Sequence, residues 1–480
     1  MELCGIITSV ISIIIAVFGI KWNTICNFFR QFKKPVEFSF ENDIFAEDTI
    51  KYRFRNIIND INNKYEDAVV KLRKNMIERP LDYDEFRDSA FQKPDYSNLT
   101  ENPSDKKLLD DFYNQYDSVD NTEYKSTKYF LEKAPFIDVE HVFYFYIIDK
   151  LKSTLSEDVK QYMCDGMSDV FDPYKLMKKE SIIKDLKKGI NKEVHKSSRI
   201  LMGLQTVTRF IKNDFSAEYT INDLVEDSII QTLNSNSYDL SQLPGMERQK
   251  MKSLKQDTIG ARDLINYLLT SERGTERTVN YLVDNAGVEF FSDLVLGYLL
   301  LKNSEYRIKE IIYHVNILPI FVSDVIENDL EYTFKIIKDY MNQVQDDINE
   351  KENFFAALRA IEDMFKEEKA RINADFIWNM PTPYELISRK REIFENSSDL
   401  IIVKGDLNYR RLCGDKSYYY KKKIDNLTKY IKCPTLVVRS FKSNLVLDYS
   451  TKRYKQNTNE DKNWRTNGKY GVIKFMRKNG

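Results

Sequence analysis

The stretch Tyr281–Leu301 reads YLVDNAGVEFFSDLVLGYLLL and contains an abrupt change of pattern. An apolar run ends at Asp284-Asn285, the chain turns through Gly287, and apolar residues resume with helical spacing over Val288–Leu301. This order predicts a buried strand, a tight turn and a buried helix. A buried strand has no local reason to end in an acid and an amide side by side. The ends of the other strands therefore decide what this pair means.

The alternation of strand and helix continues along the C-terminal half of the chain. Short apolar runs of strand type alternate with helical segments such as Val288–Leu301 and Asp324–Met341. Strands that alternate with helices form βαβ units, so we predict an α/β fold with a mainly parallel open sheet flanked by helices. The predicted strands are Thr278–Val283, Ile308–Val315, Ile372–Trp378, Asp399–Val403, Thr435–Val438 and Tyr470–Phe475.

The N-terminal half has a different pattern. Apolar residues recur at helical spacing, and almost no strand pattern occurs before about residue 270. We therefore predict a helical subdomain over residues 35–270, packed on an α/β metal-binding catalytic domain over residues 271–478. The first apolar face of this helical region consists of Ile50, Phe54, Ile57, Ile58 and Ile61.

Residues 1–34 form a hydrophobic segment and a basic linker. Residues 3–20 carry no charge, and this length is close to the roughly 20 residues that a bilayer crossing needs. Positive charges follow the segment, which by the positive-inside rule predicts a single-pass N-terminal membrane anchor with a cytosolic catalytic domain. The alternative is a soluble cytoplasmic protein in which this segment is a buried helix. The positive charges are Lys21, Arg30, Lys33 and Lys34.

Composition limits the chemistry. The formal net charge is -1, so the chain has no basic footprint for nucleic acid. The five cysteines are scattered without a CxxC pair, and the three histidines lack ligand spacing. Neither a zinc site nor a disulfide framework is indicated. A metal ion would be held mainly by carboxylate and amide oxygens, which favours Mg, Mn or a similar divalent ion.

Polar residues follow four of the predicted strands. In open α/β sheets, ligands bind beyond the carboxyl ends of the strands, so these residues are expected to converge on one site. They are Asp284-Asn285 after Thr278–Val283, Asp324 beyond Ile308–Val315, Lys404–Arg410 after Asp399–Val403, and Arg439 with Lys442 after Thr435–Val438.

The convergent residues suit phosphoryl transfer to water. Asp284, Asn285 and Asp324 supply three oxygen ligands for a divalent cation. Arg439 and Lys442 are expected to form a cationic clamp for phosphate, since positioning and charge dominate this chemistry. Asp406 and Asn408 are expected to bind sugar hydroxyls or assist proton transfer.

Each element also has a structural explanation. An Asp-Asn pair after a strand is often a turn or a helix cap, and Asp324 after Ser323 has the same alternative. Arg439 and Lys442 have the alternative of a surface salt-bridge network. The convergence of all four strand ends favours a site over coincidence.

At these residues the sequence resembles the damage-control phosphatases. The resemblance is to subfamily III, the metal-dependent sugar phosphate phosphatases, also described as acidic-residue (protein-glutamate) methyltransferases. It extends over residues 36–478. The matching segments are VDNAGVEFFSDLVL, ILPIFVSD, SDLIIVKGDLNYRRLCGD, VVRSFK, TIKYRFRNII, NSNSYDLS, WNMPTPY and GKYGVIKF.

The resemblance implies a function and a set of site residues. It implies hydrolysis of fructose 1-phosphate and fructose 6-phosphate with Mn, Co, Ni or Mg. The implied metal ligands are Asp284, Asn285 and Asp324. The implied substrate contacts are Asp284, Asn285, Asp406, Leu407, Asn408, Tyr409, Arg410 and Lys442. From the residues themselves we add Arg439 to the predicted phosphate contacts and predict Asp284, Asp324 and Asp406 as the catalytic residues.

The chain departs from the family pattern at two places. The Arg-Thr-x-Lys signature reads Arg439-Ser440-Phe441-Lys442, which keeps a hydroxyl. Asn234-Ser235 replaces the Trp-Gly expected before the DLS motif, which puts in doubt the shape of the site wall that this segment is expected to form.

Three hypotheses follow. The first is a metal-dependent phosphatase in which metal-activated water attacks phosphorus, with direct attack by Asp284 left open. The second is an S-adenosylmethionine-dependent methyltransferase of protein glutamates, whose cofactor contacts would be Glu289 and Asp324. A Gly-rich cofactor loop after the first strand is absent from the sequence, which disfavours it. The third is a non-enzymatic membrane-tethered adaptor, which the complete set of ligands disfavours.

Overall fold

Seven strands form one sheet in the computed structural model, which describes residues 35–39, 41–72, 79–89, 92–117, 127–165, 170–189, 198–235, 255–271, 276–343, 351–387, 391–395 and 399–477. The order is β1-β7-β6-β5-β2-β3-β4, and every pair is parallel except β6 with β7. The predicted α/β class with a mainly parallel sheet is confirmed. The strands are β1 (Lys255–Asp257), β2 (Arg277–Leu282), β3 (Ile308–Val315), β4 (Ala370–Ala374), β5 (Leu400–Lys404), β6 (Thr435–Ser440) and β7 (Tyr470–Met476).

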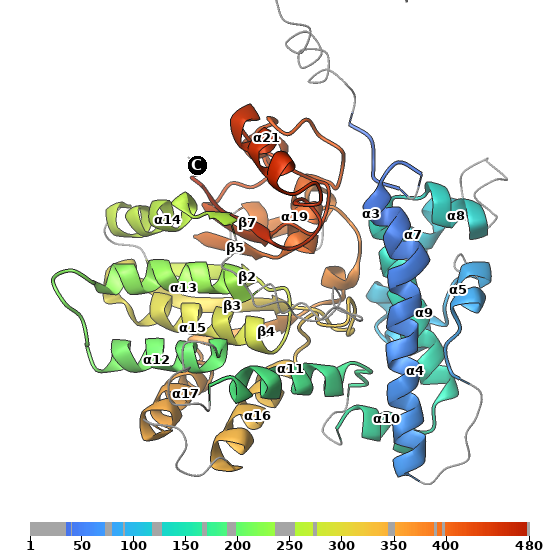
Figure 1. Ribbon diagram of the computed structural model, residues 1–480, viewed down its shortest axis with the longest axis horizontal. Coiled ribbons are helices and arrows are strands. Elements are labelled where there is room, and N and C mark those ends of the chain that lie inside the picture. Colours follow the sequence, from blue (N-terminus) through green and yellow to red (C-terminus); the bar gives the residue numbers. More distant parts are fainter. Residues whose placement is uncertain are drawn as a thin grey trace, which may run out of the picture.

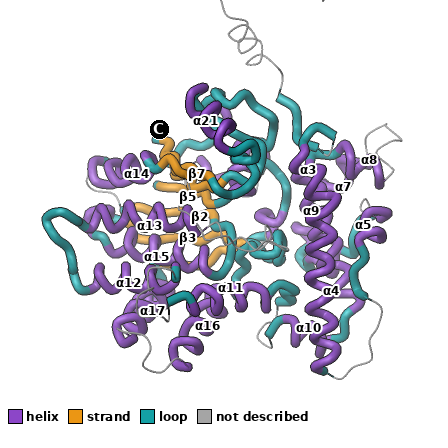
Figure 2. The backbone as a smooth tube through the Cα atoms, viewed as in Figure 1, coloured by secondary structure: helices purple, strands orange, loops and turns teal. Residues whose placement is uncertain are grey.

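Side chains of the central strand alternate between two hydrophobic clusters. Leu400 and Ile402 of β5 belong to one cluster, and Ile401 and Val403 belong to the other. This alternation is the period of two that a strand buried on both faces imposes. The sheet is therefore covered by apolar layers on both sides, and Figure 2 shows its strands enclosed by helices.

The hydrophobic cluster that contains Leu400 and Ile402 also contains the helix predicted from the stretch Tyr281–Leu301. In α15 (Val288–Lys302), every residue from Val288 to Leu301 is buried, as expected of a helix that is apolar on all sides. Gly287, with φ +72°, precedes it and makes the turn out of β2. Other helices of this half are α11 (Lys175–Lys187), α12 (Arg199–Ile211), α13 (Ile221–Ser235), α14 (Ile259–Thr270), α16 (Asp329–Gln343) and α17 (Lys351–Lys366).

The N-terminal helices form a separate layer beside the sheet (Figure 1). Phe54 stacks on Phe143 with ring centroids 3.8 Å apart, which joins α4 to α9. The helices are α3 (Ile44–Asp48), α4 (Phe54–Lys71), α5 (Tyr83–Ser89), α6 (Tyr96–Leu99), α7 (Pro103–Asp117), α8 (Thr127–Lys133), α9 (Phe136–Thr154) and α10 (Glu157–Met163). A π-helical turn, η1 (Thr49–Arg53), joins α3 to α4.

The remaining short helices follow the later strands. Their bounds are η5 (Ser304–Tyr306), η6 (Phe376–Asn379), η7 (Tyr384–Leu386), α18 (Arg391–Glu395), α19 (Asp406–Cys413), α20 (Ile424–Leu427) and α21 (Thr451–Glu460).

Several boundaries differ from those predicted. The fourth strand ends at Ala374, because Asp375 caps the 3-10 turn η6 over the residues expected to complete the strand. The helix expected from Asp324 begins at Asp329. The short strand β1 lies before residue 270, in the part of the chain that was predicted to be helical. The domain boundary near residue 270 stays a prediction. The buried apolar residues of α11–α14, which precede that boundary, belong to the same hydrophobic cluster as one face of the sheet.

The expected membrane anchor requires correction. In the part of the chain that the structure describes, no helix is both long enough and apolar enough to cross a bilayer. Residues 3–20, on which the prediction rested, lie outside the described residues. A single-pass anchor, and with it a membrane partner, is therefore not supported.

Candidate active site

Two of the polar strand ends lie side by side. β2 ends at Leu282, and Asp284-Asn285 lie just beyond it. Asn285 and Asp324 form an isolated antiparallel bridge, and the Val325 N–H donates to the Asp284 carbonyl oxygen at 3.0 Å. These backbone contacts hold the two carboxylates and the amide of the predicted metal site at one edge of the sheet.

A narrow cavity of about 40 Å³ opens at this edge. Strand-end loops, α19 and the N-terminal helices form its walls. The predicted site residues that line it are Asp284, Asn285, Asp324, Asp406, Leu407, Arg410 and Lys442. Those that do not line it are Glu289, Asn408, Tyr409 and Arg439. The lining residues that were not predicted are Phe45, Arg53, Glu140 and Phe321.

Gly405 sets how closely the start of α19 approaches Asp284. Its φ of +89° is a conformation that residues with a side chain rarely adopt. A Cβ atom built on Gly405 would lie 2.1 Å from Asp284 Cγ and 2.2 Å from Asp284 Oδ2. Glycine therefore leaves the space that the Asp284 carboxylate occupies.

A buried charge network lies behind Asn285. Its Nδ2 donates to Asp284 Oδ2 at 2.7 Å and to Glu289 Oε2 at 2.9 Å. Lys404 Nζ pairs with the other Glu289 oxygen at 2.5 Å, and both of these side chains are fully buried. Burial disfavours the ammonium ion, but Asp293 and Glu289 outweigh burial, so the pKa of Lys404 lies above its ordinary value. The network fixes the orientation of the Asn285 amide.

The loop that carries Asp324 has an unusual backbone. Phe321 and Val322 are consecutive residues with φ of +53° and +66°, in the left-handed region. This conformation is costly for a β-branched residue and persists where surrounding contacts enforce it. Asn316 Nδ2 donates to Asp324 Oδ2 at 2.7 Å, which orients the carboxylate at the end of the loop.

Lys178 of α11 contacts the same loop through a hydrogen bond to its backbone. Its Nζ donates to the Asp324 carbonyl oxygen at 3.0 Å and pairs with Asp329 at 2.7 Å and with Asp172 at 2.9 Å. Burial opposes the charge of Lys178, but the two aspartates outweigh burial and raise its pKa above the ordinary value. A hydrogen bond from a buried, ion-paired lysine therefore joins α11 to the backbone of Asp324, the residue predicted to bind metal.

Asp406 is held by three hydrogen bonds to one carboxylate oxygen. Its Oδ1 accepts from Arg439 Nε at 2.7 Å, from the Lys442 N–H at 3.1 Å and from Ser443 Oγ at 3.3 Å. Arg439 is fully buried, and its other nitrogens donate to the Leu445 carbonyl oxygen at 2.8 Å and to Ser443 Oγ at 2.9 Å. Arg439 therefore fixes Asp406 and does not reach the cavity.

Arg410 lines the cavity with its charge already balanced. Its Nε and Nη2 donate to the two oxygens of Asp415 at 3.0 and 2.8 Å, and its Nη1 donates to Glu140 at 2.6 Å. Burial disfavours the charged guanidinium, but Asp415 and Glu140 outweigh burial, so the pKa of Arg410 is raised. Leu407 contributes the adjoining apolar wall.

Asn408 and Tyr409 have contacts of a structural kind. Asn408 Nδ2 donates to the carbonyl oxygens of Val283 and Lys404 at 2.7 and 2.8 Å, which ties α19 to the ends of β2 and β5. Tyr409 is buried, with the Arg439 guanidinium 4.1 Å above its ring. These contacts position α19 relative to the sheet.

The donor atoms of the predicted metal site suit a hard divalent cation. Asp284, Asn285 and Asp324 present carboxylate and amide oxygens, and Gly405 leaves a space against Asp284 that a side chain would fill. Over the described ranges, no group of three His, Cys, Asp or Glu side chains is placed to hold a metal ion. The candidate set therefore depends on the amide oxygen of Asn285 as its third donor.

Comparison with known proteins identifies the family. The model of the family described as "Damage-control phosphatase ARMT1-like domain" matches residues 52–456. The chain belongs to this family. Membership supports a phosphatase role in metabolite repair, and it confirms the resemblance drawn from the motifs.

Curated relatives in the damage-control phosphatase ARMT1-like family carry the name damage-control phosphatase ARMT1. The one from Xenopus tropicalis is 25% identical over 78% of this chain and 82% of its own length. The one from Danio rerio is 29% identical over 41% of this chain, and the match spans less than half of that relative, 42%. A solved DUF89 family protein from Pyrococcus horikoshii covers 83% of this chain and 99% of its own at 15% identity, with a TM-score of 0.35.

The N-terminal helices of this ARMT1-like domain contribute cavity residues that sequence reasoning missed. Arg53 ends η1, Phe45 lies in α3, and Glu140 lies in α9. One sequence signal existed for Arg53. Residues 50, 53, 54 and 57 share a helix face, so Arg53 is a charge within the apolar face predicted for this region.

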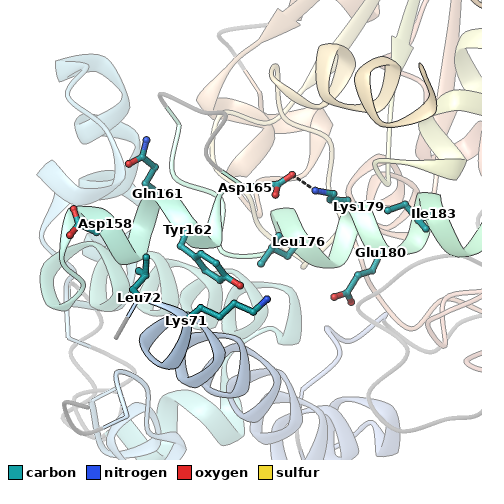
Figure 3. A pocket seen from close by; sticks show the side chains of 10 residues that line it. All are labelled: Lys71, Leu72, Asp158, Gln161, Tyr162, Asp165, Leu176, Lys179, Glu180 and Ile183. Atoms are coloured by element: carbon teal, nitrogen blue, oxygen red, sulfur yellow. Dashed lines mark hydrogen bonds and ion pairs between the residues drawn. The ribbon is translucent and has the colours of Figure 1, made fainter. Parts of the chain in front are cut away.

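A second cavity of the ARMT1-like domain lies away from the strand ends. It has a volume of about 600 Å³ and lies between α4, α10 and α11 (Figure 3). Lys179 Nζ pairs there with Asp165 at 2.6 Å, and these two side chains are 36% and 26% exposed. The convergence of buried acids and cations that marks the first cavity makes that one the candidate active site. The residues of the second are Lys71, Leu72, Asp158, Gln161, Tyr162, Asp165, Leu176, Lys179, Glu180 and Ile183.

Proposed function

We propose that the protein hydrolyses small sugar phosphates, such as fructose 1-phosphate and fructose 6-phosphate, with a divalent metal held by Asp284, Asn285 and Asp324. The observation that carries this proposal is the meeting of these three residues with Asp406 and Lys442 around one cavity. Acids and cations that line one cavity suit a metal ion and a phosphate ester. Membership of the phosphatase family supports the reaction class.

Each wall of the cavity has a part in the proposed reaction. A divalent cation bound there supplies positive charge beside the phosphoryl group. Lys442 binds the phosphate oxygens. Asp406, fixed by Arg439, accepts a hydrogen bond from a sugar hydroxyl or relays a proton from the attacking water to the leaving sugar oxygen. The buried network behind Asn285 keeps its amide in place while substrate binds.

Substrate entry requires movement at the cavity mouth. The cavity of about 40 Å³ is far smaller than the roughly 300–1,000 Å³ of sites for drug-sized ligands. Phe45, Arg53 and Glu140 on the N-terminal helices cover it. We therefore expect these helices to shift relative to the sheet when a sugar phosphate binds.

The contacts of Glu289 favour the phosphatase over the methyltransferase. Both of its carboxylate oxygens are bonded, one to Lys404 and one to Asn285, and the residue is fully buried. A contact with S-adenosylmethionine would cost these bonds. We expect no heat of S-adenosylmethionine binding in calorimetry.

Phosphate release from metal-stripped protein tests the proposal. Fructose 1-phosphate and fructose 6-phosphate are assayed with Mg, Mn, Co or Ni added back. We expect metal-dependent release that Asp284→Ala and Asp324→Ala abolish, together with the binding of one Mn ion measured by calorimetry. Asp363→Ala, an exposed acid on α17, is the matched control and keeps both. A folded wild-type chain that releases no phosphate with any metal refutes the proposal.

A further inference from the structure

One wall of the cavity belongs to the N-terminal helices. Arg53, at the end of the π-helical turn η1, lines this wall opposite the strand ends. π-helical turns are rare and occur often at functional sites. On either side of Arg53, Ile50 is 3% exposed and Phe54 is 1% exposed, so the backbone that carries the guanidinium is anchored in the core.

Arg410 and Arg439, the two arginines of the predicted site, are held by hydrogen bonds within the protein. Arg410 donates to Asp415 through two nitrogens and to Glu140 through a third. Arg439 is fully buried, and its guanidinium donates to Asp406 and to groups of the following loop. Neither guanidinium is arranged to receive a phosphate group without loss of these bonds.

Arg53 differs from both in burial and in position. It is half-buried and lines the cavity together with Lys442. Its charge also acts on the cavity wall: burial raises the pKa of Glu140, and the charges of Arg410 and Arg53 oppose that rise. A guanidinium is planar and binds phosphate through two parallel hydrogen bonds, which an ammonium group does not match.

We propose that Arg53 and Lys442 are the two cations that bind the phosphate group of the substrate, and that Arg439 is a positioning residue for Asp406. The inference rests on the proposed phosphatase function and deepens it. It makes the phosphate site a composite of an N-terminal helix and the loop after β6. The N-terminal helices then determine substrate affinity as well as covering the cavity.

Arg53→Gln, beside Arg55→Gln as the matched control, tests the proposal. Arg55 lies two residues further along the chain, in the first turn of α4; its side chain is 49% exposed, with Asp84 at 3.6 Å. We expect Arg53→Gln to raise KM at least about tenfold and to raise the inhibition constant of inorganic phosphate by a similar factor. Arg53→Lys keeps the charge but loses the two parallel N–H donors, so its KM and its inhibition constant for phosphate are expected to lie between those of the wild type and Arg53→Gln. Arg55→Gln is expected to match the wild type.

Calorimetric titration of the Mn-loaded chain with inorganic phosphate separates this inference from the proposed function. Weaker phosphate binding by Arg53→Gln than by Arg55→Gln supports the role of Arg53 even if no ester is hydrolysed. Equal phosphate affinity and equal KM in the wild type and Arg53→Gln overturn it. A wild-type chain that binds no inorganic phosphate overturns it as well. Circular dichroism establishes that each variant is folded.

Discussion

Gly405 shows how one residue can shape the proposed metal site. Its φ and ψ of +89° and 168° fall in a region that glycine alone adopts readily. Its missing side chain makes room for the Asp284 carboxylate. Gly414, at the other end of α19, has a similar φ of +82° but meets only Tyr418 Oη, at 3.6 Å. A side chain at either glycine strains the backbone, but only one at Gly405 also collides with Asp284. Comparing substitutions at the two positions therefore distinguishes the effect of backbone strain from the effect on the site.

We predict that Gly405→Ala lowers kcat/KM at least about 100-fold, because a Cβ displaces Asp284 by a distance of the order that disrupts catalysis. Gly414→Ala is expected to cost about 1–2 kcal/mol of unfolding free energy while kcat/KM and Mn affinity stay near wild type. Steady-state kinetics, Mn titration and urea unfolding measure these effects. Wild-type Mn affinity in a folded Gly405→Ala variant would contradict the placement of Asp284.

Individual side chains were only partly predictable from the sequence. The motifs predicted which strand ends carry Asp284, Asn285, Asp324 and Asp406, and the structure brings these residues to one cavity. Arg439 was expected beyond its strand, yet β6 continues through Ser440. Strand length depends on pairing with β7, which local sequence does not reveal. The roles assigned to these residues stay predictions.

At the scale of elements, α11 supports the loop of Asp324 through Lys178. The ammonium group lies between Asp172 and Asp329, and all three side chains are almost fully buried. Its neighbour Lys179 pairs with Asp165 on the surface, where the lysine side chain is 36% exposed. The same type of charge pair is therefore present in two environments on one helix.

We predict that Lys178→Met lowers the free energy of unfolding by about 3–5 kcal/mol, since it leaves two buried aspartates without their cation. Lys179→Met is expected to cost no more than about 1 kcal/mol, because its pair is solvated. Urea unfolding of both variants measures the difference. Equal stability losses would show that the buried pair has no special weight.

The elements themselves were predictable where periodicity was strong. The buried strand, glycine turn and buried helix of Tyr281–Leu301 appear as β2, Gly287 and α15. The fourth strand was predicted through Trp378, because Phe376 and Ile377 continue its apolar pattern. Asp375 instead accepts the Ile377 N–H at 3.0 Å and starts a 3-10 turn. Capping by one side chain decides such a boundary, and periodicity does not report it.

At the scale of the whole molecule, the contact between the N-terminal helices and the sheet contains a buried histidine. His141 of α9 lies with its ring 5.0 Å from that of Phe321. Its Nδ1 lies 2.6 Å from the Ile137 carbonyl oxygen, so this nitrogen carries a proton and donates it to that oxygen. Burial lowers the pKa of His141 from 6.5 to about 3.

We predict that His141 makes the molecule less stable in acid. Between pH 6.5 and about 3 the unfolded chain binds a proton at this residue that the folded chain does not. The free energy of unfolding therefore falls by up to about 1.4 kcal/mol for each pH unit of acidification. His141→Phe removes this contribution, and its free energy of unfolding is expected to fall less between pH 7 and pH 5. Urea unfolding at several pH values measures it, and identical slopes would contradict it.

One hydrophobic cluster contains residues from both halves of the chain, and this affects how the protein folds during synthesis on the ribosome. The hydrophobic cluster that buries Phe54 and Phe143 also contains Ile401, Val403 and Leu412. Translation of the roughly 250 residues between α9 and β5 takes about 12–50 s at typical elongation rates. Throughout that interval the N-terminal helices have emerged while part of their apolar partner surface has not been made. The nascent chain is therefore expected to depend on chaperones until its last quarter is translated.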